Sequence, residues 1–135
     1  MTRLIDAHSC PFLLSAGFVA LLEWELATVE PVPASGVILH FRNPGYSAET
    51  GGFHPVEICI GATGRIEYIT DFAFVGRGPY AELVKEIDFD FSLGLLQHFS
   101  REFPIYAGRE LFAVWQENFV AYHRMGAYTV EASEM

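Results

Sequence analysis

Apolar and polar residues alternate along several stretches between residues 37 and 75, which is the pattern of half-buried β-strands. Val37–Arg42 alternates in this way and predicts one strand. His54–Ile60 and Arg65–Val75 are rich in β-branched and aromatic residues, and Gly61–Gly64 between them has the composition of a tight turn. These stretches therefore predict a strand followed by a β-hairpin.

Helical patterns lie toward the two ends of the chain. Phe12–Leu26 is apolar on most sides, which is typical of a helix buried against a sheet or a partner subunit. The prolines of the segment Glu30–Gly36 end that helix and predict a linker. Gly108–Met125 repeats apolar residues at helical spacing, and Gly126 follows as a predicted C-terminal cap.

The region between the hairpin and the last helix has a weaker pattern. Pro79 followed by Tyr80–Ile87 predicts a short helix, because proline is favoured at the first helical position. Asp88–Phe91 alternates again and predicts an extended segment. Leu93–Phe103 is compatible with either a helix or an extended segment, and Ala127–Glu131 predicts a final strand.

These elements predict an α+β fold, with a twisted antiparallel sheet of about four to six strands. The N-terminal and C-terminal helices are expected to pack on one face of that sheet. The length of 135 residues corresponds to one domain, residues 1–135. Within it, residues 1–36 would form the N-terminal helix and linker, and residues 37–131 the sheet and the C-terminal helix.

Composition narrows the possible partners. The formal net charge is −9 with only eight Lys and Arg residues, which excludes non-specific nucleic-acid binding through clustered basic residues. The apolar run Pro11–Leu22 is shorter than the roughly 20 residues that cross a bilayer. Cys10 and Cys59 have neither metal-type spacing nor a disulfide framework. We therefore expect a cytoplasmic protein that binds neither membranes nor nucleic acids.

The hairpin places one histidine opposite one aspartate. If residues 61–64 form the loop, Ile60 faces Arg65, Val56 faces Ile69, and His54 faces Asp71 on a mostly apolar face. A carboxylate beside an imidazole fixes its tautomer and raises its basicity, as a general base or metal ligand requires. The alternative is a buried polar pair in which each side chain serves only as the hydrogen-bond partner of the other. No nucleophile motif accompanies the pair, and no catalytic residue is assigned.

Further polar residues complete the set of candidates. Asp88 and Asp90 share one strand face, where two carboxylates hold a divalent cation or form a solvated acidic edge that prevents edge pairing. Tyr46 and Glu49 lie in a polar loop. The predicted binding residues are therefore Tyr46, Glu49, His54, Asp71, Asp88 and Asp90. No cofactor is predicted, and Asp88 and Asp90 are the candidates for a metal.

The chain resembles a bacterial family known only as domain of unknown function 2787 (DUF2787), over about Val37 to Val130. The matching segments are Phe41–Glu49, Gly51–Glu57, Tyr68–Phe72, Glu82–Phe91, Gly108–Phe112 and Trp115–Phe119, together with Tyr122. The resemblance implies a small bacterial protein, often carried on mobile islands, with no established activity or catalytic residue. It also implies a fold similar to the mitochondrial acidic matrix protein family, whose members are oligomeric proteins with many partners.

Two functional hypotheses follow from these observations. The first is an acidic, non-enzymatic protein-interaction module that forms a homo-oligomer and binds a protein partner. It rests on the charge, the aromatic content, the absence of a catalytic motif and the resemblance. The second is a small-molecule- or metal-dependent hydrolase-like enzyme. In that enzyme His54 would act as the base, while Asp71, Asp88 and Asp90 would orient it or hold a cation.

Overall fold

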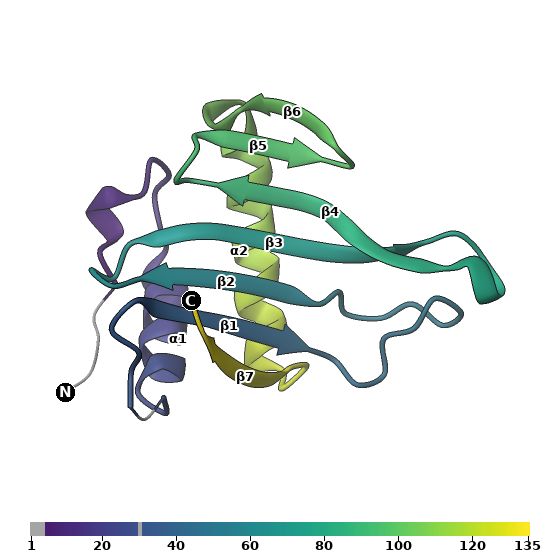
Figure 1. Ribbon diagram of the computed structural model, residues 1–135, viewed down its shortest axis with the longest axis horizontal. Coiled ribbons are helices and arrows are strands. Elements are labelled where there is room, and N and C mark those ends of the chain that lie inside the picture. Colours follow the sequence, from purple (N-terminus) through teal and green to yellow (C-terminus); the bar gives the residue numbers. More distant parts are fainter. Residues whose placement is uncertain (1–4, 30) are drawn as a thin grey trace.

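A computed structural model of the chain describes residues 5–29 and 31–135. In this part of the chain, seven strands form one antiparallel sheet in the order β6-β5-β4-β3-β2-β1-β7 (Figure 1). The strands are β1 (Gly36–Arg42), β2 (Val56–Gly61), β3 (Ile66–Val75), β4 (Glu82–Asp90), β5 (Leu95–His98), β6 (Arg101–Pro104) and β7 (Thr129–Glu134). The α+β class is confirmed, but the strand count exceeds the predicted four to six.

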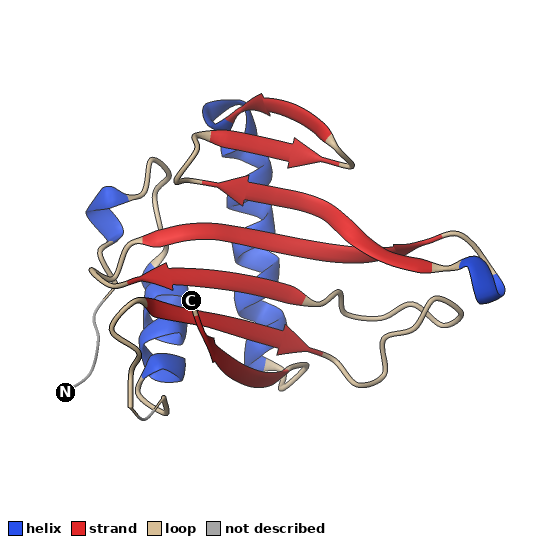
Figure 2. Ribbon diagram, in the orientation of Figure 1, coloured by secondary structure: helices blue, strands red, loops and turns tan. Residues whose placement is uncertain are grey.

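The helices α1 (Ala16–Leu26) and α2 (Arg109–Arg124) cover the same face of the sheet (Figure 2). Three short 3-10 helices, η1 (Ala7–Ser9), η2 (Gly78–Tyr80) and η3 (Ile105–Gly108), complete the helical elements of the described residues. Among those residues, no helix combines the length and the apolar character needed to cross a bilayer. The packing of both helices on one face agrees with the prediction.

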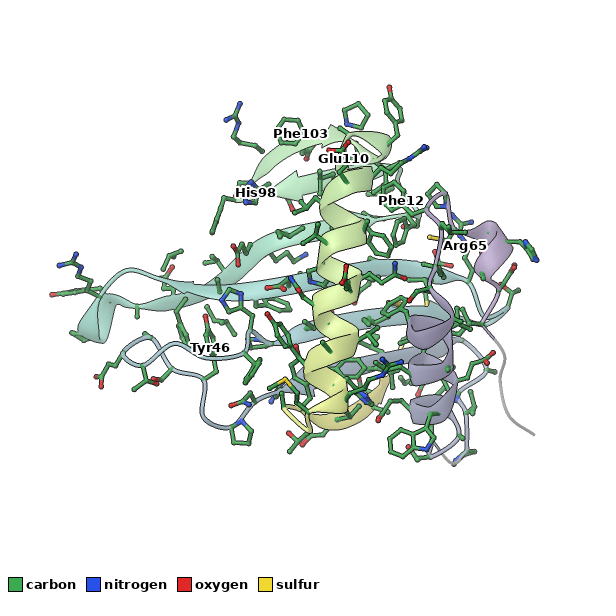
Figure 3. All side chains as sticks on the ribbon, turned by 180° about the vertical axis from the view of Figure 1, so that it is seen from behind. Phe12, Tyr46, Arg65, His98, Phe103 and Glu110 are labelled. Carbon is green, nitrogen blue, oxygen red and sulfur yellow. The ribbon has the colours of Figure 1, made fainter. Side chains whose placement is uncertain are left out.

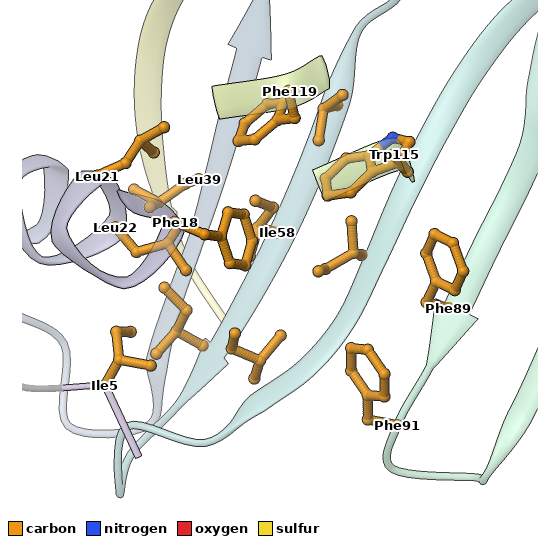
Figure 4. Packing of buried hydrophobic residues seen from close by; sticks show 14 of the residues in the cluster. Ile5, Phe18, Leu21, Leu22, Leu39, Ile58, Phe89, Phe91, Trp115 and Phe119 are labelled. Carbon is orange, nitrogen blue, oxygen red and sulfur yellow. The ribbon is translucent and has the colours of Figure 1, made fainter. Parts of the chain in front are cut away.

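The core fills the space between the helices and the sheet. Its largest fully buried side chains include five phenylalanines, which come from α1, β1, β4 and α2: Phe18, Phe41, Phe89, Phe112 and Phe119. Phe41 meets Phe119 edge to face, with ring centroids 5.0 Å apart. Figure 4 shows Phe18 and Leu22 of α1 pointing toward the strand residues of this cluster. Such aromatic contacts stabilise the layer beyond simple burial of area.

Helix α1 begins four residues later than predicted. Ser15 has an extended backbone, and its Oγ accepts a hydrogen bond from the Phe18 backbone N–H at 3.1 Å, which caps the helix. Phe12 therefore lies before the helix, where its ring packs on Phe91 and Phe112. The apolar residue that suggested an earlier helix start is instead a core contact of an extended segment.

The predicted helix at Tyr80–Ile87 is wrong. Only η2 is helical there, and Glu82–Asp90 forms β4, which pairs with β3 from Val75↔Glu82 to Tyr68↔Asp90. The hydrogen bonds of this long ladder outweigh the local helical spacing of Leu83 and Ile87, since strand pairing depends on the partner rather than on propensity alone. The ambiguous segment 93–103 contains β5 and most of β6.

The register of the β2–β3 hairpin differs from the prediction by two positions. Val56 pairs with Asp71 rather than with Ile69. The turn shifts the register by one residue, so that Ile60 pairs with Ile66, and a bulge at Glu67 shifts it by one more. Side chains alternate with a period of two, so the residues beyond the bulge, where the shift is two, remain on their predicted faces.

Beyond the helix layer, β3 and β4 continue as a two-stranded arm that ends at η2 (Figure 1). The loop 43–55 runs beside this arm. Tyr46 ties the loop to the arm, because the Phe74 backbone N–H donates to its hydroxyl at 2.9 Å and its ring stacks on that of Phe74 at 5.2 Å. The loop and the base of the arm bring Tyr46, His54 and Asp71 together beside α2.

Candidate functional site

Three ionisable side chains meet at the base of the arm. Nδ1 of His54 lies 2.9 Å from Oδ1 of Asp71 and 3.0 Å from Oε2 of Glu86. His54 comes from the loop before β2, Asp71 from β3 and Glu86 from β4. The predicted contact between His54 and Asp71 is therefore present, and Glu86 is an additional member. We refer to these three residues as the triad.

A β-bulge brings Glu86 to the triad. Asp71 pairs with Ile87 while Phe72 pairs with Lys85, so Glu86 is the extra residue of β4. A bulge re-aims side chains locally, and bulges are common beside functional sites. Without it, Glu86 would lie on the face opposite to Ile87 and Asp71 because neighbouring strand residues point to opposite faces. The extra residue thus adds a second carboxylate beside His54.

Helix α2 holds the other side of the Asp71 carboxylate. The indole Nε1–H of Trp115 donates to Oδ2 of Asp71 at 2.9 Å. Burial raises the pKa of Asp71 above its usual value, although the hydrogen bonds from Trp115 and His54 act in the opposite direction. The negative charge of Glu86 adds to the upward shift. Asp71 is therefore oriented by two partners from separate elements.

The triad lies at one side of a cavity of about 500 Å³. The cavity wall is aromatic where α2 and the segment after it contribute, and it includes Trp115, Phe119, Tyr122 and Tyr128. Burial raises the pKa of Tyr128, and the charge of Asp71 raises it further, so this hydroxyl stays neutral. Among the described residues that line the cavity, none is Lys or Arg. A concave apolar wall with a few convergent polar groups is the usual form of a small-ligand site.

A family model described as "Protein of unknown function (DUF2787)" matches residues 16–133. The chain belongs to this family. The match begins at the start of α1, which lies before the segment that resembles the family on motifs alone. No curated protein matches the chain.

Two solved structures of Vibrio cholerae proteins are similar to this DUF2787 chain. The hypothetical protein VC0508 of the VSP-II pathogenicity island is 37% identical, with a TM-score of 0.77 over 96% of this chain and 99% of that one. The conserved hypothetical protein VC1805 of pathogenicity island VPI-2 is 38% identical, with a TM-score of 0.79 over 92% and 97%. VC1805 is described as sharing structural homology with the human P32 protein, in agreement with the resemblance to the mitochondrial acidic matrix protein family.

The other predicted residues of this family member lie at different distances from the triad. The ring of Tyr46 is 5.3 Å from that of His54, and Figure 3 shows Tyr46 in the loop beside the arm. Glu49 is exposed in the same loop. Asp88 lies on the opposite face, where it is buried and accepts a hydrogen bond from Thr70 at 2.8 Å. Asp90 accepts bonds from the turn residues Ser92 and Leu93.

The four residues of the hydrolase hypothesis therefore do not form one cleft, because the sheet separates Asp88 from the triad. Ser47 and Cys59, whose side chains could act as nucleophiles and which lie near His54 in the sequence, are also placed elsewhere. Ser47 bonds to Thr50 at 2.6 Å within the loop. Burial raises the pKa of Cys59, which is on the opposite face, to about 11. Neither supplies a nucleophile beside His54.

Sequence reasoning missed Glu86 and Trp115. Glu86 falls within the segment predicted as a short helix, and the bulge that re-aims it leaves no local signal in the sequence. The helical spacing of the last helix places Trp115 in the core, and its ring is indeed buried there. A buried indole N–H requires an acceptor, however, and Asp71 was the polar residue expected on that face of the sheet. That requirement was the available signal.

Proposed function

We propose that this protein binds a small cationic ligand in the cavity between the arm and α2. The observation that carries the proposal is the convergence of the Asp71 and Glu86 carboxylates on His54 in a cavity whose described lining contains no Lys or Arg. Asp71 is the most buried of the three side chains, and a cation beside a partly buried carboxylate is attracted more strongly than it would be in bulk solvent. The acidic composition of the whole chain also favours cationic ligands.

The aromatic wall supports the same ligand class. Faces of Trp and Tyr rings attract cations through their quadrupoles, with about 0.5–2 kcal/mol for each contact. Trp115, Tyr122 and Tyr128 line the same cavity as the triad. A cation in this cavity would therefore have both the carboxylates and neutral aromatic rings in its surroundings. Organic amines and metal ions are both members of this class.

Intrinsic fluorescence provides a direct test. Trp24 is 65% exposed, so a Trp24→Phe background leaves Trp115 as the reporter beside the triad. We expect choline, putrescine, Mn²⁺ or Zn²⁺ to change its emission in a saturable way. Glu86→Gln is expected to weaken the binding at least tenfold, about 1.4 kcal/mol.

The matched control is Asp88→Asn, which removes a carboxylate from the opposite face of the same strand. This variant is expected to bind like the parent. The proposal is wrong if none of the four probes binds, or if Asp88→Asn weakens binding as much as Glu86→Gln does.

We also propose, as a second candidate, that the helix layer mediates self-association with a second copy of the chain. Leu13 is 92% exposed and Val114 is 59% exposed, both on the side of the molecule that carries the helices. Exposed apolar side chains mark association surfaces where they lie next to one another, and Leu13 lines the same surface hollow as Ala113, the residue before Val114. The sheet edge at β7 is less suited to pairing, since Glu131 and Glu134 place charges along it.

Sedimentation velocity tests self-association. We expect an oligomer that dissociates at lower concentration when Leu13 and Val114 are both changed to Ser. Leu93→Ser is the control, because this side chain is 72% exposed in the turn between β4 and β5. A monomer at all concentrations, or equal weakening by the control, would reject this second candidate.

A further inference from the structure

We propose that the cation is a divalent metal ion, bound by Nδ1 of His54 and by one carboxylate oxygen each of Asp71 and Glu86. This inference rests on the proposed function and narrows its ligand class to a metal. Imidazole nitrogen and carboxylate oxygen are both common metal ligands. The remaining coordination positions would be open toward the cavity that these residues line.

The distances between the donor atoms fit one ion. Two neighbouring ligands of an octahedral ion at bond lengths of about 2.1 Å are about 3.0 Å apart, and two opposite ligands are about 4.2 Å apart. Nδ1 of His54 lies 2.9 Å from the Asp71 oxygen and 3.0 Å from the Glu86 oxygen. All three donor atoms lie within 4.8 Å of one another. Only small side-chain movements are therefore needed to surround an ion.

The charges also favour a divalent ion over a proton. A neutral imidazole has one N–H, so Nδ1 can present a single proton to two carboxylates at similar distances. The negative charge of the second carboxylate is then only partly compensated. A divalent cation compensates both carboxylates at once and leaves the neutral imidazole as a ligand.

Neighbouring residues orient the ligands from outside the triad. Trp115 donates to Oδ2 of Asp71, which leaves Oδ1 directed toward His54. The ring of Tyr46 lies 5.3 Å from the His54 ring, and Phe74 holds the Tyr46 hydroxyl. Such outer contacts position metal ligands and raise affinity. They come from β3, α2 and the loop, so the triad depends on the complete fold.

The chemistry of the donors selects a class of metal. Imidazole favours first-row transition ions and zinc, while carboxylates favour harder ions such as Mn²⁺. Mg²⁺ and Ca²⁺ prefer sites made only of oxygen donors. A set of one imidazole and two carboxylates therefore fits Zn²⁺ or Mn²⁺ better than Mg²⁺ or Ca²⁺.

The test uses the full chain, treated with a chelator and then dialysed. Isothermal titration with Zn²⁺ and with Mn²⁺ is expected to give one ion per chain. His54→Gln and Glu86→Gln are each expected to weaken binding at least tenfold, and Asp88→Asn is the control that retains affinity. Far-ultraviolet circular dichroism of each variant verifies that it is folded. For Mn²⁺, pulsed electron paramagnetic resonance is expected to detect a histidine nitrogen that disappears in His54→Gln.

The outcomes separate this inference from the proposed function. If choline or putrescine binds and depends on Glu86 while neither metal binds, the metal inference is wrong and the cationic-ligand proposal stands. If a metal binds but His54→Gln and Glu86→Gln retain full affinity, the ion lies elsewhere and the inference is also wrong. If neither metals nor organic cations bind, both proposals are rejected.

Discussion

Asp71 and Trp115 are 44 positions apart in the chain, yet the Trp115 indole N–H donates to the Asp71 carboxylate at 2.9 Å. This hydrogen bond joins the centre of the sheet to the helix layer at the edge of the candidate site. It orients the carboxylate that also contacts His54. The link therefore fixes one member of the triad in place.

Replacing Trp115 by Phe removes the donor and keeps an aromatic ring in the core. We expect the free energy of unfolding to fall by about 1–3 kcal/mol, because a partly buried carboxylate oxygen loses its partner. Urea unfolding measures the change. Trp24→Phe is the control, since this exposed position is expected to change stability by no more than about 0.5 kcal/mol. Equal stability of the two variants would contradict the role assigned to the hydrogen bond.

Stability should depend on pH through Asp88. Burial raises the pKa of this carboxyl in the folded protein, despite the hydrogen bond from Thr70. The native state therefore binds its proton more tightly than the unfolded chain does. The resulting stabilisation is present below the ordinary carboxyl pKa and is lost as the pH rises through the folded value.

Asp88→Asn removes this proton linkage. We expect the stability of the parent minus that of the variant to decrease as the pH rises from about 4 to about 7. Urea unfolding at several pH values measures the difference. A difference that is constant, or that grows with pH, would show that the Asp88 pKa is not raised.

The two thiols are expected to react at different rates. Cys59 is buried and its pKa is raised to about 11, whereas Cys10 is only half-buried. Iodoacetamide at about pH 8 should therefore modify Cys10 first, and Cys59 only when the protein unfolds. Peptide mass spectrometry identifies the modified residue. In a Cys10→Ser variant, rapid modification without denaturant would be the contrary result.

Gly126 should be costly to replace even though it has space around it. Its φ is +77°, no atom lies within 4 Å of the position of an added Cβ, and its N–H donates to the His123 carbonyl at the end of α2. We expect Gly126→Ala to destabilise the protein by about 1 kcal/mol through backbone strain alone. Asn tolerates this backbone conformation better, so Gly126→Asn should lose less in the same thermal or urea unfolding measurement. Equal losses would contradict this explanation.

Local patterns in the sequence were sufficient for a large part of the fold. The predicted C-terminal helix, Gly108–Met125, agrees with α2 within one residue at each end, because its apolar spacing and its glycine cap are local signals. The facing of His54 and Asp71 was also predictable. The two-residue error in register did not change the face of Asp71, since side chains alternate along a strand, and His54 reaches Asp71 from the loop before β2.

Tertiary structure decided the rest. Glu82–Asp90 is a strand because β3 pairs with it, and that pairing connects residues through space rather than through sequence spacing. The bulge that adds Glu86 to the triad exists only in that pairing. The same sheet puts Asp88 on the opposite face, and α2 brings Trp115 to Asp71 from a distant part of the chain. The sequence by itself thus determined the two helices, the strands β1 to β3 and the face on which Asp71 lies, whereas β4 and the composition of the candidate site depended on long-range pairing and packing.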